Sequence, residues 1–204
     1  MKILHLGKYF PPHAGGMETY LRDLMAELSR RGLENTALVH QSGISLTTSE
    51  ETYRAGEQGL CVVRAAVWAR LLFTPMSPSF PWRLRKLIRQ QKPDILHLHM
   101  PNVSAFWVLF LPSARRIPWV IQWQSDVLAS RYSLGLRLFY RLYRPFERLL
   151  LKRSKAVIAS SPTYLESSAP LQDFRDKCAI VPLGLDPAFI LPATACPPPV
   201  DGSS

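Results

Sequence analysis

Short hydrophobic runs alternate with amphipathic stretches along most of the chain. The run from Lys2 to Leu6 is followed by apolar residues at three- and four-residue steps, which predicts a buried strand, a loop and a helix from Met17. Further strands are predicted at 36–40, 60–67, 93–99, 119–123, 155–159 and 178–181. Helical spacing between them favours right-handed crossovers, so we expect an α/β fold with a parallel sheet covered on both faces.

Ligands of such a sheet bind beyond the carboxyl ends of its strands. The loops that follow the predicted strands are therefore the places to look for a site, and we expect them to converge on one edge. These loops are 9–16, 99–102, 124–126 and 160–164.

The segments between the strands differ in character. Residues 42–59 are polar and predict a surface loop. Residues 71–82 mix prolines with large apolar side chains, which indicates either a loop folded over the core or a hydrophobic lip for a partner or lipid. Residues 82–91 predict a basic helix, and another helix is predicted from Val103.

The first loop carries adjacent glycines, Gly15 and Gly16, at the start of the predicted helix. Free N–H groups and the positive end of a helix dipole suit a phosphate or carboxylate there. A tight turn that binds nothing is the alternative. The glycine spacing matches neither the dinucleotide fingerprint nor a P-loop.

Composition narrows the partners without choosing among them. The chain has 204 residues, 47% of them hydrophobic, and a formal charge of +10, which favours nucleic acid, an acidic membrane or a phosphorylated substrate. Cys61, Cys178 and Cys196 have no disulfide or zinc spacing, so we expect a reducing cytosol. The longest apolar run, 103–111, is too short to span a membrane.

Polar residues near the predicted strand ends are candidates for a site. His97 and His99 face the same side of a strand and could bind a metal, but no third ligand has a recognisable spacing, so we expect no metal and a cleft residue at His99. Asp126, beside Ser125, could orient a sugar hydroxyl or cap the next helix.

Residues 134–153 predict a strongly basic helix. On a helical wheel its cations fall within roughly 80°, with apolar residues opposite, and Pro145 is expected to kink or split it. Repulsion between like charges favours an anionic partner for this stripe, although a solvated face is equally compatible. The cations are Arg137, Arg141, Arg144, Arg148 and Lys152.

Five short motifs, in order, resemble the N-terminal half of group 1, or family 4, retaining glycosyltransferases of the GT-B fold, of the bacterial surface-polysaccharide type. The resemblance covers Met1 to about Asp186. The motifs are Gly15-Gly16-Met17-Glu18, Pro93 to His99, Trp123 to Asp126, Ser161 to Tyr164, and Val181 to Asp186.

The resemblance implies a Rossmann-like acceptor-side domain over residues 1–187. It places Gly15 and Gly16 beside the diphosphate of a nucleotide-sugar donor such as GDP-mannose or a UDP-sugar, with no further cofactor. His99, Ser125 and Asp126 are implied on the cleft wall. A glycan or lipid-linked acceptor and a cytoplasmic location, peripheral on the inner membrane face, are implied as well.

Two features depart from the family. Gln124 stands where relatives usually have histidine, and an amide cannot carry a proton near neutral pH. With Asp126 it nevertheless remains the candidate catalytic position. Residues 188–204 are a proline-rich tail or the start of a linker to a donor-binding domain, so we expect this domain alone to be inactive.

Two other functional classes remain as alternatives to sugar transfer. A non-catalytic basic module could dock on an anionic membrane or protein partner. Nucleic-acid binding is disfavoured, because aromatic residues do not interleave with the basic ones on a strand face.

Overall fold

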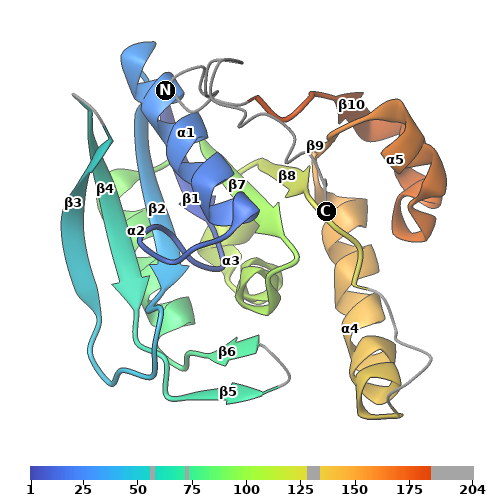
Figure 1. Cartoon of the computed structure of the whole chain (residues 1–204), viewed down its shortest axis with the longest axis horizontal. Coiled ribbons are helices and arrows are strands. Elements are labelled where there is room, and N and C mark those ends of the chain that lie inside the picture. The colour runs from blue at the N-terminus through green and yellow to red at the C-terminus, as the bar shows by residue number, and fades with distance from the viewer. Residues whose placement is uncertain (56–57, 72–73, 128–133, 185–204) are drawn as a thin grey trace, which may run out of the picture.

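The computed structural model describes residues 1–55, 58–71, 74–127 and 134–184. Its main sheet has eight strands in the order β10-β9-β8-β7-β1-β2-β4-β3 (Figure 1). All neighbours pair in parallel except β3 and β4. The strands are β1 (Lys2–Leu6), β2 (Glu34–His40), β3 (Ser49–Ala55), β4 (Gln58–Ala65), β7 (Ile95–Met100), β8 (Trp119–Trp123), β9 (Ala156–Ala159) and β10 (Cys178–Ile180).

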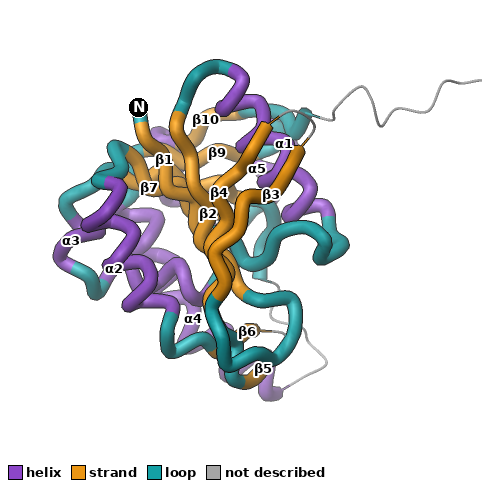
Figure 2. The backbone as a smooth tube through the Cα atoms, turned by 90° about the vertical axis from the view of Figure 1, so that its left-hand side faces the viewer, coloured by secondary structure: helices purple, strands orange, loops and turns teal. Residues whose placement is uncertain are grey.

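Helices lie on both sides of this sheet, as Figure 2 shows for α1 on one side and α2, α3 and α4 on the other. The predicted α/β fold is thus confirmed, in a mostly parallel rather than wholly parallel form. The helical elements are α1 (Gly16–Arg30), α2 (Phe80–Gln91), η1 (Val103–Leu109), α3 (Pro112–Arg115), α4 (Leu134–Arg153), α5 (Pro162–Ser167) and η2 (Ala169–Lys177), of which η1 and η2 are 3₁₀ helices.

Two apolar cores correspond to the two faces. The larger core joins alternate residues of β1, β7 and β8 to α2, η1 and α4, and includes Leu4, Leu98 and Ile121. The smaller core lies under α1, where Leu21 and Met25 pack on β2 and β4. Strands covered on both faces bury side chains in both directions, which explains the continuous hydrophobic runs in the sequence.

Two predicted loops contain strands instead. The polar segment 42–59 forms β3, which pairs antiparallel with β4 at the sheet edge. Its burial is low because an edge strand can leave its outer face to solvent, so the segment lacks the apolar signal of the inner strands.

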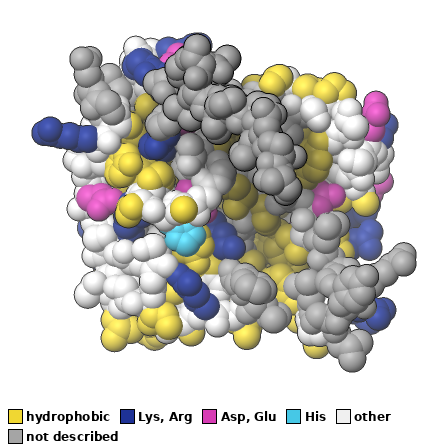
Figure 3. Space-filling view, in the orientation of Figure 1, with side chains coloured by type: hydrophobic (Ala, Val, Ile, Leu, Met, Phe, Trp, Pro, Cys, Tyr) yellow, Lys and Arg dark blue, Asp and Glu magenta, His cyan; other side chains and the backbone are white. Residues whose placement is uncertain are grey.

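The irregular segment 71–82 takes part in a hairpin of β5 (Ala69–Leu71) and β6 (Thr74–Met76). Leu71 and Met76 are exposed there, as is Trp68 just before the hairpin. Hydrophobic side chains are visible along the lower rim of the molecule in Figure 3, where this hairpin lies in Figure 1. Pro75 and Phe80 of the same segment are buried, so the segment packs partly on the core and partly exposes apolar side chains. Its role as a lip for a partner or lipid stays a prediction.

Helix α4 differs from its prediction in two ways. It is one continuous helix through Pro145, so the predicted split is wrong, whereas the kink stays a prediction. Its apolar residues also divide between two faces: Tyr143, Leu150 and Leu151 are buried, whereas Leu138, Leu142, Phe146 and Leu149 are exposed.

None of the helices in the described part of the chain combines the length and apolar character needed to cross a lipid bilayer. The proline-rich end predicted at 188–204 lies outside the described residues.

Candidate functional site

The predicted loops lie side by side at one edge of the sheet. Strands β1, β7, β8 and β9 are adjacent and parallel, so the loops that leave their carboxyl ends are neighbours. A hydrogen bond from the Gln124 amide to the Met100 carbonyl, 3.1 Å long, joins the loop after β8 to the end of β7. The sheet order therefore brings the candidate residues to one region.

The loop before α1 is anchored by Phe10 and by a buried arginine. The Phe10 ring is fully buried in the smaller core and contacts Tyr53 edge-on. Arg64 of β4 donates to the carbonyls of Phe10 and Pro11, at 3.2 and 2.5 Å, and pairs with Glu51 at 2.7 Å. This arginine holds the loop in position from beneath.

Gly15 and Gly16 open α1 as predicted, and Gly15 is its N-cap. The carboxylate of Glu18 lies directly against Gly15, because a Cβ built there would meet its Oε2. An acid in the first turn compensates the positive end of a helix. Any anion that binds these glycines must therefore share the helix end with Glu18 or displace it.

Aromatic and basic side chains gather around the same loop. The Tyr9 and His13 rings have centroids 4.2 Å apart, and the Lys8 ammonium and Arg70 guanidinium lie 5.7 and 5.8 Å from the Tyr9 ring. Burial lowers the pKa of Lys8, partly opposed by nearby Glu18. Sequence patterns did not single out this group, because Arg70 reaches the loop from a distant hairpin.

Asp126 is held by three donors. Its Oδ1 accepts from Trp123 Nε1 at 2.8 Å, from the Tyr164 hydroxyl at 2.9 Å and from Ser168 Oγ at 2.7 Å. Burial, and then the adjacent Asp126, raise the pKa of Tyr164. This carboxylate therefore links the loop after β8 to α5 and η2. The alternative prediction, that Asp126 caps the next helix, involves residues 128–133, which lie outside the described residues.

Polar atoms without protein partners lie at the ends of β7 and β8. Gln124 Oε1 and Asn102 Nδ2 are buried and have no hydrogen-bond partner among the described residues. Asn102 Oδ1, in contrast, caps η1 by accepting from the Ser104 amide. Ser125, next to Gln124, is exposed. Unpaired buried polar groups are costly, so their position at this edge points to a ligand.

His99 is less accessible than the sequence suggested. It is 4% exposed, and it lies between the sheet and the Tyr20 ring of α1. His97 lies beside it as predicted, but the third histidine, which has no recognisable spacing in sequence, is His5 of β1. Burial lowers the pKa of all three imidazoles, that of His97 to about 4, so they are neutral at pH 7.

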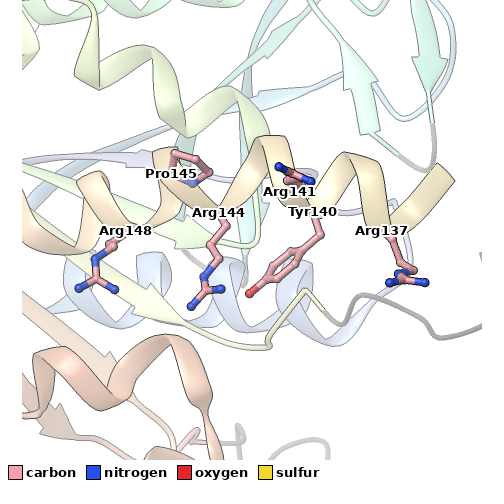
Figure 4. Close-up of a pocket in the computed structure, with 6 residues that line it drawn as sticks. All are labelled: Arg137, Tyr140, Arg141, Arg144, Pro145 and Arg148. Atoms are coloured by element: carbon pink, nitrogen blue, oxygen red, sulfur yellow. The ribbon is translucent and has the colours of Figure 1, made fainter. Parts of the chain in front are cut away.

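The predicted cation stripe lines an open groove of about 560 Å³ on α4. Arg137, Tyr140, Arg144 and Arg148 extend from the same side of the helix, as Figure 4 shows. Arg148 forms an exposed ion pair with Asp173 at 2.8 Å, so one positive charge of the stripe is already neutralised by a carboxylate of the protein. Lys152, one turn beyond Arg148, is exposed but does not line the groove.

Comparison with known proteins identifies relatives along most of the chain. The model of the family described as glycosyl transferase 4-like domain matches residues 15–184. The O-antigen chain mannosyltransferase C of Escherichia coli is 26% identical over 191 residues, which are 91% of this chain and 46% of the relative. The D-rhamnosyltransferase WbpZ of Pseudomonas aeruginosa is 28% identical over 187 residues, 91% of this chain and 45% of the relative.

The fold is also found in larger solved structures. Sucrose-phosphate synthase from Thermosynechococcus elongatus gives a TM-score of 0.61 at 16% identity, covering 91% of this chain and 48% of the other. The catalytic domain of starch synthase IV from Arabidopsis thaliana, bound to ADP and acarbose, gives 0.59 at 17% identity, covering 91% and 52%. The chain thus has the fold of one Rossmann-like half of a GT-B enzyme.

The chain spans about half the length of the curated relatives it matches. The family model nevertheless covers α1 and every later strand of the main sheet, whereas β1 and most of the loop that follows it lie outside the match. On this match, the chain belongs to the glycosyl transferase 4-like domain family.

Proposed function

We propose that this chain is the acceptor-side domain of a retaining glycosyltransferase that uses a nucleotide sugar, such as GDP-mannose or a UDP-sugar. The acceptor is a glycan or lipid-linked glycan in bacterial surface-polysaccharide assembly. The observation that carries the proposal is the position of the Gly15–Gly16 helix end at the same sheet edge as the Asn102 and Gln124 atoms that are unpaired within the described part of the chain. Family membership supports the reaction class, and it disfavours a non-catalytic docking module.

Each group has a role that its chemistry permits. The amides of Gly15 and Gly16 stabilise the negative charge on the departing nucleoside diphosphate, because a helix N-terminus favours anions. Gln124 Oε1 accepts a hydrogen bond from a sugar hydroxyl and positions the substrate, since an amide cannot transfer a proton at neutral pH. Asp126 holds this loop against α5, and the exposed Ser125 completes the wall.

The test measures transfer of labelled sugar from a panel of nucleotide sugars to lipid-linked acceptors by the full-length protein. Gly16→Val is the diagnostic variant, because a Cβ at Gly16 meets no atom within 4 Å in the folded chain. Any loss of activity then reports on the ligand rather than on packing. We expect a loss of at least about tenfold, which corresponds to about 1.4 kcal/mol.

Gly43→Val is the matched control, since a Cβ at Gly43 is equally free of contacts and lies in an exposed loop. We expect it to transfer sugar at the wild-type rate. Equal activity of both variants would argue against a donor at the α1 terminus. Gln124→His, tested beside them, shows whether the glutamine retunes transfer or suppresses it.

We also propose that the enzyme works at the cytoplasmic face of an anionic membrane, with α4 in contact with the lipid. On a helical wheel the exposed surface of α4 divides into a cationic arc of roughly 80° and an adjacent apolar arc of similar width. Adjacent basic and apolar stripes are typical of helices that lie in a membrane interface. The apolar stripe is Leu138, Leu142, Phe146 and Leu149. Trp107 of η1 and Phe110, the residue after η1, are exposed nearby.

Sedimentation with phosphatidylglycerol vesicles tests this contact. Replacing Arg137, Arg141 and Arg144 with glutamine removes three cations, each worth about 1 kcal/mol near an anionic surface, so binding should fall by at least about tenfold. The control replaces Arg85, Lys86 and Arg89 of α2, which carry the same charge on an exposed face. A similar loss in both variants would indicate attraction by net charge alone and contradict docking through α4.

A further inference from the structure

Three of the five histidines in the chain form one buried cluster. His5 pairs with His97 in the register of β1 and β7, and His99 follows two residues later on the same side of β7. One nitrogen of each ring lies within 4.8 Å of the others. Strand pairing therefore fixes three imidazoles on one face, beneath α1.

The cluster satisfies little of its own hydrogen-bonding capacity. One bond, 3.3 Å long, joins His5 Nδ1 to His99 Nε2. His5 Nε2, His97 Nε2 and His99 Nδ1 are buried without a partner among the described residues, and the neighbouring Gln122 also leaves Nε2 unpaired. A buried polar atom left unpaired costs about 1–3 kcal/mol, so such a concentration calls for a ligand.

His40 shows what a buried histidine looks like when the protein supplies its partners. It is as deeply buried as His5, yet its Nδ1 bonds to the Lys8 carbonyl at 2.7 Å and its Nε2 to Ser104 Oγ at 2.9 Å. Both of its nitrogens are used. The three-histidine cluster differs from it in hydrogen bonding, not in burial.

We propose that His5, His97 and His99 bind a divalent transition-metal ion, with Zn²⁺ as the best match. Neutral imidazole is a common ligand for Zn²⁺, and three protein ligands with one further position is an established zinc arrangement. Burial keeps the rings neutral, so no proton competes for their lone pairs near pH 7.

The fit requires only side-chain adjustment. Ligands about 2.0–2.1 Å from Zn²⁺ in a tetrahedral site are about 3.4 Å apart, which is shorter than the upper limit of 4.8 Å here. The rings already lie with centroids 4.5 to 5.5 Å apart. Rotation about their side-chain torsions brings the nitrogens together, while the paired strands stay in place.

The bound ion would link β1 to β7 directly below the loop that carries Gly15 and Gly16. Both strands end at the proposed cleft, at Leu6 and Met100. The ion would crosslink two central strands at a buried position, and its fourth position would be filled by water or another small ligand. The inference does not depend on the proposed sugar transfer.

The experiment measures binding of Zn²⁺ and Co²⁺ to full-length protein that carries no histidine tag and has been treated with a chelator. Titration calorimetry and elemental analysis give the stoichiometry, and thermal unfolding gives the stabilisation. We expect one equivalent of metal, a higher unfolding midpoint with Zn²⁺ and the visible absorption of tetrahedral Co²⁺. Stoichiometry after each substitution is compared with that of the wild type.

His5→Gln and His97→Gln should each weaken Zn²⁺ binding by at least about tenfold. His40→Gln is the matched control, because it alters another buried histidine and should leave metal binding unchanged. His97→Cys is a second test in case a glutamine variant fails to fold. Because a thiolate is also a metal ligand, this variant should bind Zn²⁺ and Co²⁺ and show a sulfur-to-Co²⁺ charge-transfer band.

Two results would overturn the metal site. One is a folded wild-type protein that takes up no Zn²⁺ or Co²⁺. The other is uptake that persists unchanged in His5→Gln and His97→Gln, which would place the ion elsewhere. Neither outcome bears on sugar transfer, because the Gly16→Val and Gly43→Val comparison tests that function at different residues.

Discussion

Strand β7 shows two different chemistries on its two sides. Leu96, Leu98 and Met100 enter the larger apolar core, whereas His97 and His99 face the side covered by α1. Both sets are buried: the leucines are 0% exposed, and the histidines are 8% and 4% exposed. Burial is thus nearly equal, and hydrogen-bonding capacity is what distinguishes the two faces.

The difference shows which part of the sheet stabilises the fold and which part is available for ligands. Apolar side chains on both faces would suffice for a doubly covered parallel strand. The α1 face instead keeps imidazoles and an amide, and some of their atoms have no partner among the residues that the structure describes. Changes on the apolar face should therefore cost stability, whereas changes on the polar face should alter binding.

The largest expected effect is on the apolar face. Leu98→Ala removes a fully buried side chain from the larger core and leaves a cavity, so the free energy of unfolding should fall by about 2–5 kcal/mol. Denaturant unfolding measures this loss. His97→Gln, measured without metal, is the comparison on the opposite face, and its free energy of unfolding should fall by less. An equal or greater fall would contradict the idea that the apolar face contributes more to stability.

Asp126 tests whether a polar group can also be structural. Asp126→Ala leaves Trp123 Nε1, the Tyr164 hydroxyl and Ser168 Oγ without their acceptor, so unfolding should become easier by about 2–3 kcal/mol. Denaturant unfolding again gives the value. Asp126→Asn keeps an oxygen acceptor and should lose less than the alanine variant. Wild-type stability in both variants would restrict Asp126 to substrate binding.

Glu147 is an ionisable residue buried on the side of the sheet that is otherwise apolar. Its replacement should have the smallest effect on stability of the changes considered. It is 2% exposed on α4, and burial, reinforced by Asp126 and opposed by Arg144, raises its pKa to about 7. Between the usual carboxyl value of about 4.5 and pH 7 the folded protein therefore keeps a proton that the unfolded chain releases. Wild-type stability should fall as pH rises through this window.

Glu147→Gln keeps the shape of the side chain and removes its ionisation. We expect this part of the pH dependence to disappear, and the unfolding midpoint at pH 8 to exceed that of the wild type by a few degrees, on the order of 1 kcal/mol or more. Thermal unfolding at pH 4 and pH 8 provides the measurement. Parallel pH profiles for both proteins would show that Glu147 ionises freely in the folded state.

The sequence alone determined the alternation of the inner parallel strands with helices, and hence the α/β class. Periodicity predicted β1, α1, β2, β4, β7, β8, β9 and β10, because short apolar runs indicate strands of a parallel sheet and a stripe at helical spacing indicates α1. The motifs around Gly15, His99 and Asp126 likewise identified the family. These properties are local, so neighbouring residues suffice to encode them.

Only the tertiary structure decided which distant side chains meet. Edge strand β3 lacked an apolar signal, because its outer face needs no burial. The division of α4 into buried and exposed apolar stripes depended on how far the core reaches around the helix. His5 joined His97 and His99, and Tyr164 and Ser168 joined Asp126, through the pairing and packing of elements far apart in sequence. The spacing of residues along the chain does not predict such contacts, because the order of strands in the sheet determines which residues meet.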